Sequence, residues 1–102
     1  MVTETVGTVR ALASVPTPLA VWYLTRLCKH FQHRCPVALG KRAGRIGFGR
    51  GHCSLVATEG ALILVLDAPD ATVMARLQDV VARHLARFAF RETLALDWQP
   101  AG

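Results

Sequence analysis

Long apolar runs, acidic residues and paired cysteines are all scarce in this chain of 102 residues. Its apolar runs, such as residues 61–66, are far shorter than the roughly 20 residues of a membrane-spanning helix. The first residues, MVTETVGTVRALA, show no basic start followed by an apolar stretch, so we expect no secretion signal and a cytoplasmic protein. Cys28, Cys35 and Cys53 cannot all pair within one chain, and we expect reduced thiols.

Composition indicates one folded domain with a basic surface. Apolar residues make up 52% and charged residues 19% of the chain, which excludes a disordered protein. Twelve Lys and Arg stand against seven Asp and Glu, for a formal net charge of +5. Such a surface attracts anionic partners, although net charge alone does not specify one. The length is that of a single domain, residues 1–102.

Two stretches have the periodicity of amphipathic helices. From residue 70, Met74, Leu77, Val81, Leu85 and Phe88 share one side, Asp67 or Asp70 can cap the start, and arginines recur on the other side. The second helix is predicted over residues 18–34, with Thr17 as its cap and Pro18 in its first position. Leu27 is the centre of its apolar face, and Pro36 ends it. Trp22 lies away from Leu27 and is expected either at a contact surface or packed beneath the N-terminal strand.

The remaining segments read as strands and turns. Residues 3–12 predict a first strand at a sheet edge, and residues 44–48 a short strand followed by a turn at 49–51. Residues 52–57 and 61–66 form a hairpin in which Gly60 takes the positive-φ position. Leu94, Leu96 and Trp98 alternate in a closing strand over residues 93–98, and residues 99–102 are expected to fray.

The predicted order is therefore strand, helix, three strands, helix, strand. Two helices with a single apolar face each most simply cover one face of one sheet. We predict an α+β fold, a two-layer sandwich of a mostly antiparallel sheet with both helices on one face.

Three segments carry a family resemblance: LCKHFQHRCPV (27–37), GHCSL (51–55) and RLQDVVARHLARFAFRETLALDW (76–98). With them the chain resembles bacterial domain-of-unknown-function family 2218 over nearly its whole length. The resemblance implies a small bacterial α+β domain without an assigned activity. It also implies a siderophore-interacting flavin reductase as partner, and thus a link to siderophore iron. The chain departs from the family pattern at Cys35 and in a longer basic run at residues 41–45.

Histidines provide the main site hypothesis. His30 and His84 each lie about 60° from the centre of their helix's apolar face, so they can meet across the helix interface. His33 is predicted on the same helix as His30. Arg91 and Glu92 belong to the family segment 76–98 but are not needed for the apolar face of its helix. These five residues, His30, His33, His84, Arg91 and Glu92, are our ligand-binding candidates. A structural role for the flanking histidines is the alternative.

A metal or redox site using Cys28, His30 and His33 is a further alternative. On a helix, however, Cys28 and His30 differ by about 200° and point apart, and no closed set of four ligands follows from the spacing. We therefore assign no metal and no cofactor.

A glycine-rich basic run, residues 40–51, contains G-x-x-G-x-G, which is neither a dinucleotide fingerprint nor a P-loop. Its cations Lys41, Arg42, Arg45 and Arg50 are candidates for anion or nucleic-acid contacts. A basic nucleic-acid-binding module is thus the second function that the sequence allows, with a solvated loop as the structural alternative.

Nucleophilic catalysis has no support in these residues. Cys53 directly follows His52, and neighbours on a strand point to opposite faces, while Ser54 has no base at a readable spacing. We expect a non-catalytic accessory domain that binds a small ligand or a partner protein, with no membrane segment and an undetermined oligomeric state.

Overall fold

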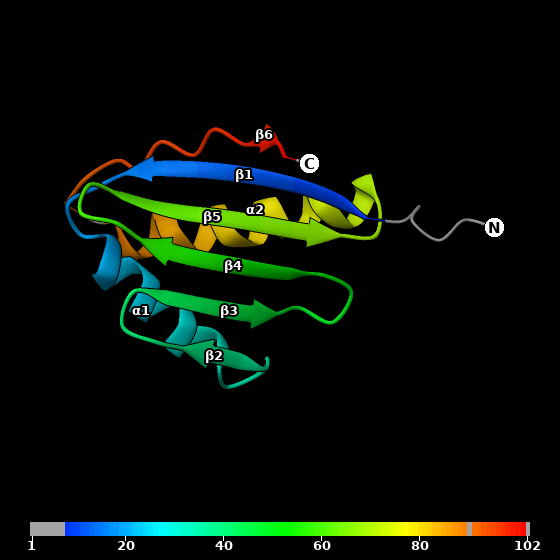
Figure 1. Cartoon of the computed structure of the whole chain (residues 1–102), viewed down its shortest axis with the longest axis horizontal. Helices are drawn as coiled ribbons and strands as arrows, with labels where there is room; N and C mark the ends of the chain where they lie inside the picture. Colours follow the sequence, from blue (N-terminus) through cyan, green and yellow to red (C-terminus); the bar gives the residue numbers. More distant parts are fainter. Residues whose placement is uncertain (1–7, 90, 102) are drawn as a thin grey trace.

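The computed structural model describes residues 8–89 and 91–101, which form an α+β fold of one sheet and two helices (Figure 1). The helices are α1 (Ala20–Phe31) and α2 (Ala71–Phe88). The strands are β1 (Val9–Pro16), β2 (Val37–Leu39), β3 (Ala43–Gly47), β4 (His52–Ala57), β5 (Ala61–Ala68) and β6 (Gln99–Pro100).

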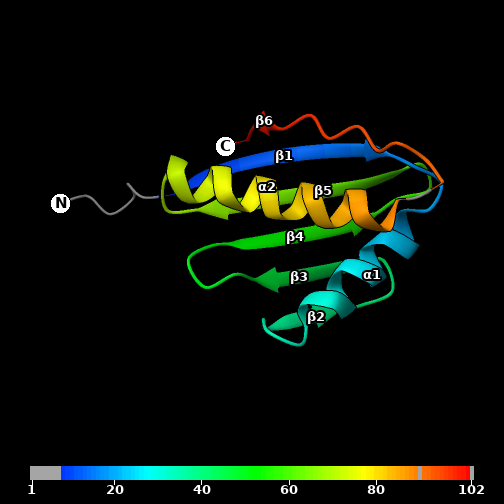
Figure 2. The same ribbon diagram turned by 180° about the vertical axis from the view of Figure 1, so that it is seen from behind.

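All neighbouring strands pair antiparallel, in the order β2-β3-β4-β5-β1-β6. Figure 2 shows both helices on the same face of this sheet, with α2 along β5 and β1 and α1 near β3 and β2. The predicted class, element order and two-layer arrangement are confirmed. The structure adds the short strand β2, which three residues form by pairing with β3.

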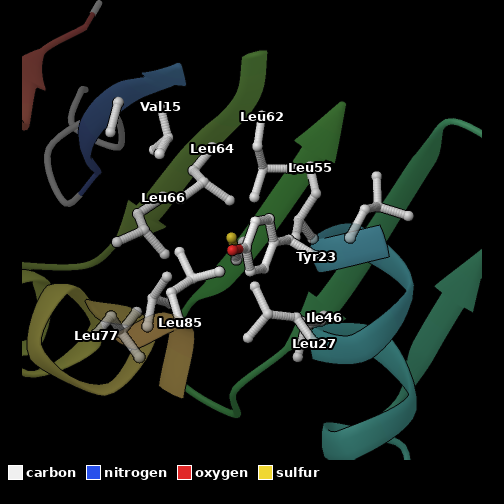
Figure 3. Close-up of a cluster of buried hydrophobic side chains, with 14 of the residues drawn as sticks. Val15, Tyr23, Leu27, Ile46, Leu55, Leu62, Leu64, Leu66, Leu77 and Leu85 are labelled. Atoms are coloured by element: carbon white, nitrogen blue, oxygen red, sulfur yellow. The ribbon is translucent and has the colours of Figure 1, made fainter. Parts of the chain in front are cut away.

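The core lies between the sheet and the two helices. On β1 and β5 the inward side chains are fully buried, as at Val15, Leu62 and Leu64. Figure 3 shows these residues pointing toward Tyr23 and Leu27 of α1 and toward Leu77 and Leu85 of α2. The predicted apolar faces of both helices therefore bury against one set of strand residues, which is why the fold needs only two layers.

The weak alternation of the first strand predicted a position at an edge of the sheet. This prediction is wrong, because β1 lies inside the sheet. It pairs along its whole length with β5, from Val9 opposite Ala68 to Pro16 opposite Ala61, and β6 covers its other side. Small inward residues made the pattern weak, yet Ala13 has no exposed surface. The predicted start of this strand, before residue 8, lies outside the described residues.

The closing strand is shifted toward the C-terminus from its predicted position at residues 93–98. Leu94, Leu96 and Trp98 alternate and pack half-buried against the core, but their segment does not pair in the sheet. Pairing occurs only at β6, opposite Ala11 and Leu12, and the amide of Ala101 donates to the carbonyl of Arg10. The alternating burial of these residues therefore indicated an extended backbone but not strand pairing. Where the strand forms depends on the free hydrogen-bonding groups along the edge of β1. The predicted frayed end is in fact attached through residue 101.

Two local predictions also change. The helix predicted over residues 18–34 spans Ala20–Phe31. It begins late because Thr17 Oγ1 accepts from the amide of Leu19 and holds a turn there, and residues 32–34 form a turn after it, so His33 lies beyond the helix. Of the described glycines, Gly49 has the positive φ, 83°, and not Gly60. The prediction for α2 is confirmed at its start, where the carboxylate of Asp70 accepts from the amide of Val73 at 2.8 Å.

Neither described helix combines the length and apolar character needed to cross a membrane.

Gly51, just before β4, occupies a place where a side chain does not fit. A Cβ atom there would lie 2.5 Å from the carbonyl oxygen of Asp67 and 2.6 Å from Leu77 of α2. We predict that Gly51→Ala lowers the free energy of unfolding by about 1–3 kcal/mol, measured by denaturant titration. Gly60→Ala is the matched control, because a Cβ at Gly60 has no neighbour within 4 Å among the described residues. Equal stability of the two variants would contradict this account.

Candidate functional site

The candidate site is the interhelix seam, the line along which α1 meets the C-terminal half of α2. On α1, Trp22, Arg26 and His30 follow each other at intervals of four residues, so they stand on one side of the helix. On α2, His84 and Phe88 face them at the same interval. The His30 ring lies 5.8 Å from that of Phe88, and the Arg26 guanidinium 5.2 Å from it. Two pockets open along this seam.

His30 and His84 meet, an arrangement that the sequence allowed and left open. Their ring centroids are 4.8 Å apart, and Phe31 lies 4.8 Å from His84. A cavity of about 460 Å³ opens here, the imidazole pocket, lined by His30, Phe31, His33, Arg34 and His84. The structure thus brings together all three histidines proposed from the sequence.

The two imidazoles differ in their hydrogen bonding. His84 Nδ1 lies 2.7 Å from the carbonyl oxygen of Val80. Because a carbonyl only accepts, Nδ1 carries the proton, and Nε2 is the nitrogen that can take up a second one. Partial burial lowers the pKa of His30, and the positive charges of His84, Arg87, His33 and Arg34 add to this effect. The lowered pKa favours the neutral form of His30.

The second opening, the aromatic pocket, is mainly apolar. It has a volume of about 200 Å³ and is lined by Leu19, Trp22, Tyr23, Phe88 and Arg91. Trp22 is 41% exposed, as its position on the helical wheel predicted. Arg26 is outside this lining, but its guanidinium carbon lies 5.3 Å from the Trp22 ring and 5.2 Å from the Phe88 ring. One arginine thus lines the aromatic cavity, and a second stacks on two of its rings.

Glu92 has an internal role that the sequence did not indicate. Its Oε2 accepts hydrogen bonds from the hydroxyls of Thr17 and Tyr23, each at 2.9 Å. These bonds tie the segment after α2 to the turn before α1, directly below the aromatic pocket. Of the two predicted ligand residues in this segment, Arg91 therefore borders the pocket and Glu92 supports its Tyr23 wall.

The cysteine residues lie apart from the histidines. Cys28 is fully buried on the sheet side of α1, beneath Gly44, whereas His30 is exposed at the seam. Burial raises the pKa of Cys28, and burial together with Cys28 raises that of Cys53 to about 12. Within residues 8–89 and 91–101, no three His, Cys, Asp or Glu side chains are grouped as a metal site requires. The described arrangement therefore gives no support to the alternative site using Cys28, His30 and His33.

The four cations of the glycine-rich run are distributed over β3 and the turns at its two ends. Lys41 and Arg42 lie in the turn between β2 and β3, Arg45 lies on β3, and Arg50 lies in the turn at its other end. Arg50 is 3.7 Å from the carboxylate of Asp70. The strand that lies between them is the one predicted at residues 44–48, which the structure places at Ala43–Gly47.

A separate polar cluster lies on the side of the sheet away from the helices. Asp67 accepts from Arg10 Nε at 2.7 Å and lies 3.0 Å from His52 Nε2, with the three residues opposite each other on β5, β1 and β4. The hydrogen bond from Arg10 lowers the pKa of Asp67. His52 thus points away from Cys53, which is buried on the other side, as strand alternation predicted.

Comparison with known proteins places the fold and the seam in a family. Residues 12–99 match the family described as an uncharacterized protein conserved in bacteria, DUF2218. The chain belongs to the DUF2218 family. The resemblance noted in the sequence is thereby confirmed, and the matched residues include both helices and the whole interhelix seam.

A solved structure supports the same assignment. This DUF2218 domain is similar to the NMR structure of PA4090 from Pseudomonas aeruginosa, with 41% sequence identity and a TM-score of 0.77. The match covers 91% of this chain and 97% of that one. No curated protein matches the chain.

Several residues of this DUF2218 site did not emerge from the sequence. Phe88 was predicted only as part of the apolar face of its helix, and Leu19, Tyr23 and Arg26 carried no site prediction. The four-residue spacing of Trp22, Arg26 and His30 was the available signal, since it aligns them on one side of α1. The partner helix could not be inferred from that spacing.

Tyr23 gives a direct test of the support below the pocket. Burial, followed by the hydrogen bond to Glu92 and its negative charge, raises the pKa of Tyr23 from 10.0 to about 12. Tyr23 is the single tyrosine of the chain, so tyrosinate absorbance reports it alone. We predict ionisation near that raised value and, with Glu92→Gln, at a lower pH that stays above 10.0, because burial remains.

The same shift makes stability depend on pH. The unfolded chain releases the Tyr23 proton at lower pH than the folded chain, so this contribution is complete below 10.0 and is lost as pH rises toward about 12. An ordinary tyrosine titration in the folded protein would contradict the Tyr23–Glu92 hydrogen bond.

Proposed function

We propose that this domain is a non-catalytic binding module that takes a small aromatic anion in the aromatic pocket of the interhelix seam. The observation that carries the proposal is an aromatic cavity with Arg91 in its lining and with Arg26 stacked on two of its rings. Leu19, Trp22 and Phe88 offer apolar contact, and Arg91 and Arg26 offer charge. Aromatic body and carboxylate are the two groups that such a pocket recognises.

The size of the cavity sets the class of ligand. An apolar cavity of about 150 Å³ accepts benzene, and the aromatic pocket measures about 200 Å³. A single substituted ring is therefore the body that fits. Its carboxylate would reach the guanidinium of Arg91, whose fork suits bidentate contact with a carboxylate.

The family resemblance suggests which aromatic anions to test first. Siderophores that hold iron through catecholate groups contain aromatic rings with anionic oxygens, which is the chemistry that the pocket favours. On this proposal the domain holds such a group beside a siderophore-interacting flavin reductase, the partner that the resemblance implies. The buried, protonated thiols of Cys28 and Cys53 are consistent with a binding role, because a thiol is a poor nucleophile.

Calorimetric titration with benzoate tests the proposal. We predict a dissociation constant of about 0.1–1 mM at low salt, weaker binding of the neutral analogue benzamide, and loss of about five- to tenfold in affinity with Arg91→Gln. Trp22→Leu should also weaken binding because it removes one aromatic wall. Dihydroxybenzoate should bind more tightly than benzoate if the natural ligand is a catecholate.

Arg76→Gln is the matched control, since Arg76 is an exposed arginine of α2 outside the residues that line the pocket. Equal affinity for benzoate and benzamide, or equal losses in the two arginine variants, would overturn the proposal. Equal affinity for benzoate and dihydroxybenzoate would leave the aromatic-anion pocket in place and remove its siderophore assignment.

A further inference from the structure

The imidazole pocket, at the other end of the interhelix seam, has a chemistry of its own. Its polar lining residues are His30, His33, Arg34 and His84, and Phe31 forms its apolar wall. Among the described residues that line it there is no carboxylate. One permanent cation and three titratable ones thus converge on a cavity of about 460 Å³.

We propose that the imidazole pocket binds a doubly charged oxyanion, such as a sulfate or phosphate group, across the His30–His84 ring pair. This site lies beyond the proposed function, because it uses different residues and needs no aromatic ligand. The ring centroids stand 4.8 Å apart, so an oxyanion over the pair can reach both rings. Each ring then donates one N–H to a different oxygen.

The hydrogen bond of His84 prepares it for this role. With Nδ1 donating to the carbonyl of Val80, ring rotation is restrained and Nε2 is the remaining nitrogen. Protonation at Nε2 therefore converts that nitrogen into a charged donor. The same bond makes the proton acceptor of His84 a single, defined atom.

Charge around the rings explains why an anion would be needed. The groups facing His30 are His33 and Arg34 from the turn after α1 and His84 and Arg87 from α2, all of one sign when protonated. A neighbouring cation on α2, Arg83, is paired at 2.9 Å with Asp79, so this carboxylate is already engaged. The positive charges lower the pKa of His30, and a bound dianion would offset them. Binding and protonation of the pair are therefore coupled.

The sign of this coupling follows directly. Acid charges the rings and strengthens anion binding, and the anion in turn raises the pKa of His30. Sulfate is a suitable probe because it stays a dianion throughout the titration range of histidine. Any change in sulfate affinity with pH then comes from protonation of the protein and not of the anion.

The experiment is an NMR titration of the four histidines with sodium sulfate, at about pH 8 and about pH 5.5, with chloride holding the ionic strength constant. We expect sulfate to raise the pKa of His30 and to bind about tenfold more tightly at the lower pH. A tenfold difference in affinity between the protonated and the neutral protein corresponds to a rise of about one unit in the pKa of one group on binding. Resonances of His30, His33, Arg34 and His84 should shift. His52, which is paired with Asp67, should not.

Variants separate the site from general attraction to a basic surface. His30→Gln and His84→Gln should each abolish most of the pH dependence, whereas His52→Gln, the same chemical change on the other face of the sheet, should leave it intact. Equal shifts at His52 and at the seam would overturn the proposal, and so would unchanged sulfate binding in the His30 and His84 variants. Benzoate binding by these variants is measured in parallel, so failure of the sulfate site and failure of the aromatic pocket are told apart.

Discussion

The fold depends on one constraint: a single sheet must bury its apolar side under only two helices. Inward residues of β1, β4 and β5 are almost completely buried, so both helices must press their apolar faces onto the same surface. Each helix then leaves a flank next to the other. The interhelix seam is therefore a consequence of the two-layer arrangement, and side chains placed about 60° from each apolar face are brought together there.

Electrostatics at the seam follow from where the acidic residues are used. Asp67 pairs with Arg10 and His52 on the far side of the sheet, Asp70 caps α2, and Asp79 holds Arg83. Glu92 accepts from two hydroxyls. The cations between the helices consequently face one another, with aromatic rings as their close neighbours. Such a surface favours anions with an apolar body, because it combines positive potential with water-excluding walls.

The segment after α2 links the end of the chain to this surface. Thr17 and Tyr23 donate to Glu92, while Leu94, Leu96 and Trp98 pack against the core and β6 joins the edge of β1. The hydrogen-bonded carboxylate of Glu92 holds one end of this segment, and the pairing of β6 with β1 holds the other. The extended chain between them is thus fixed although it forms no continuous ladder of backbone hydrogen bonds. Arg91, beside Glu92, is thereby held at the rim of the aromatic pocket.

Local pattern was sufficient for much of this architecture. The apolar periodicity of both helices, the hairpin of β4 and β5 and the cap at Asp70 each depend on residues close in sequence, and all are present. The place of His30 and His84 on the flank of each apolar face was predictable from the sequence, but their contact was decided by how the two helices pack. The interior position of β1 and the place of β6 were not predictable, since they depend on which strand edge remains available for pairing.

By itself, the sequence determined the class of fold, the buried faces and the flank positions of the two histidines, because period and side-chain direction are set by the local backbone. Only the tertiary structure decided that Glu92 lies under Tyr23, that Arg26 covers Trp22 and Phe88, and that the basic residues of the glycine-rich run are distributed over β3 and the turns at its two ends. Those contacts join residues far apart along the chain or depend on the rotation of one helix against another. No periodicity encodes such a distance, and it becomes fixed only when the two helices settle on their shared sheet.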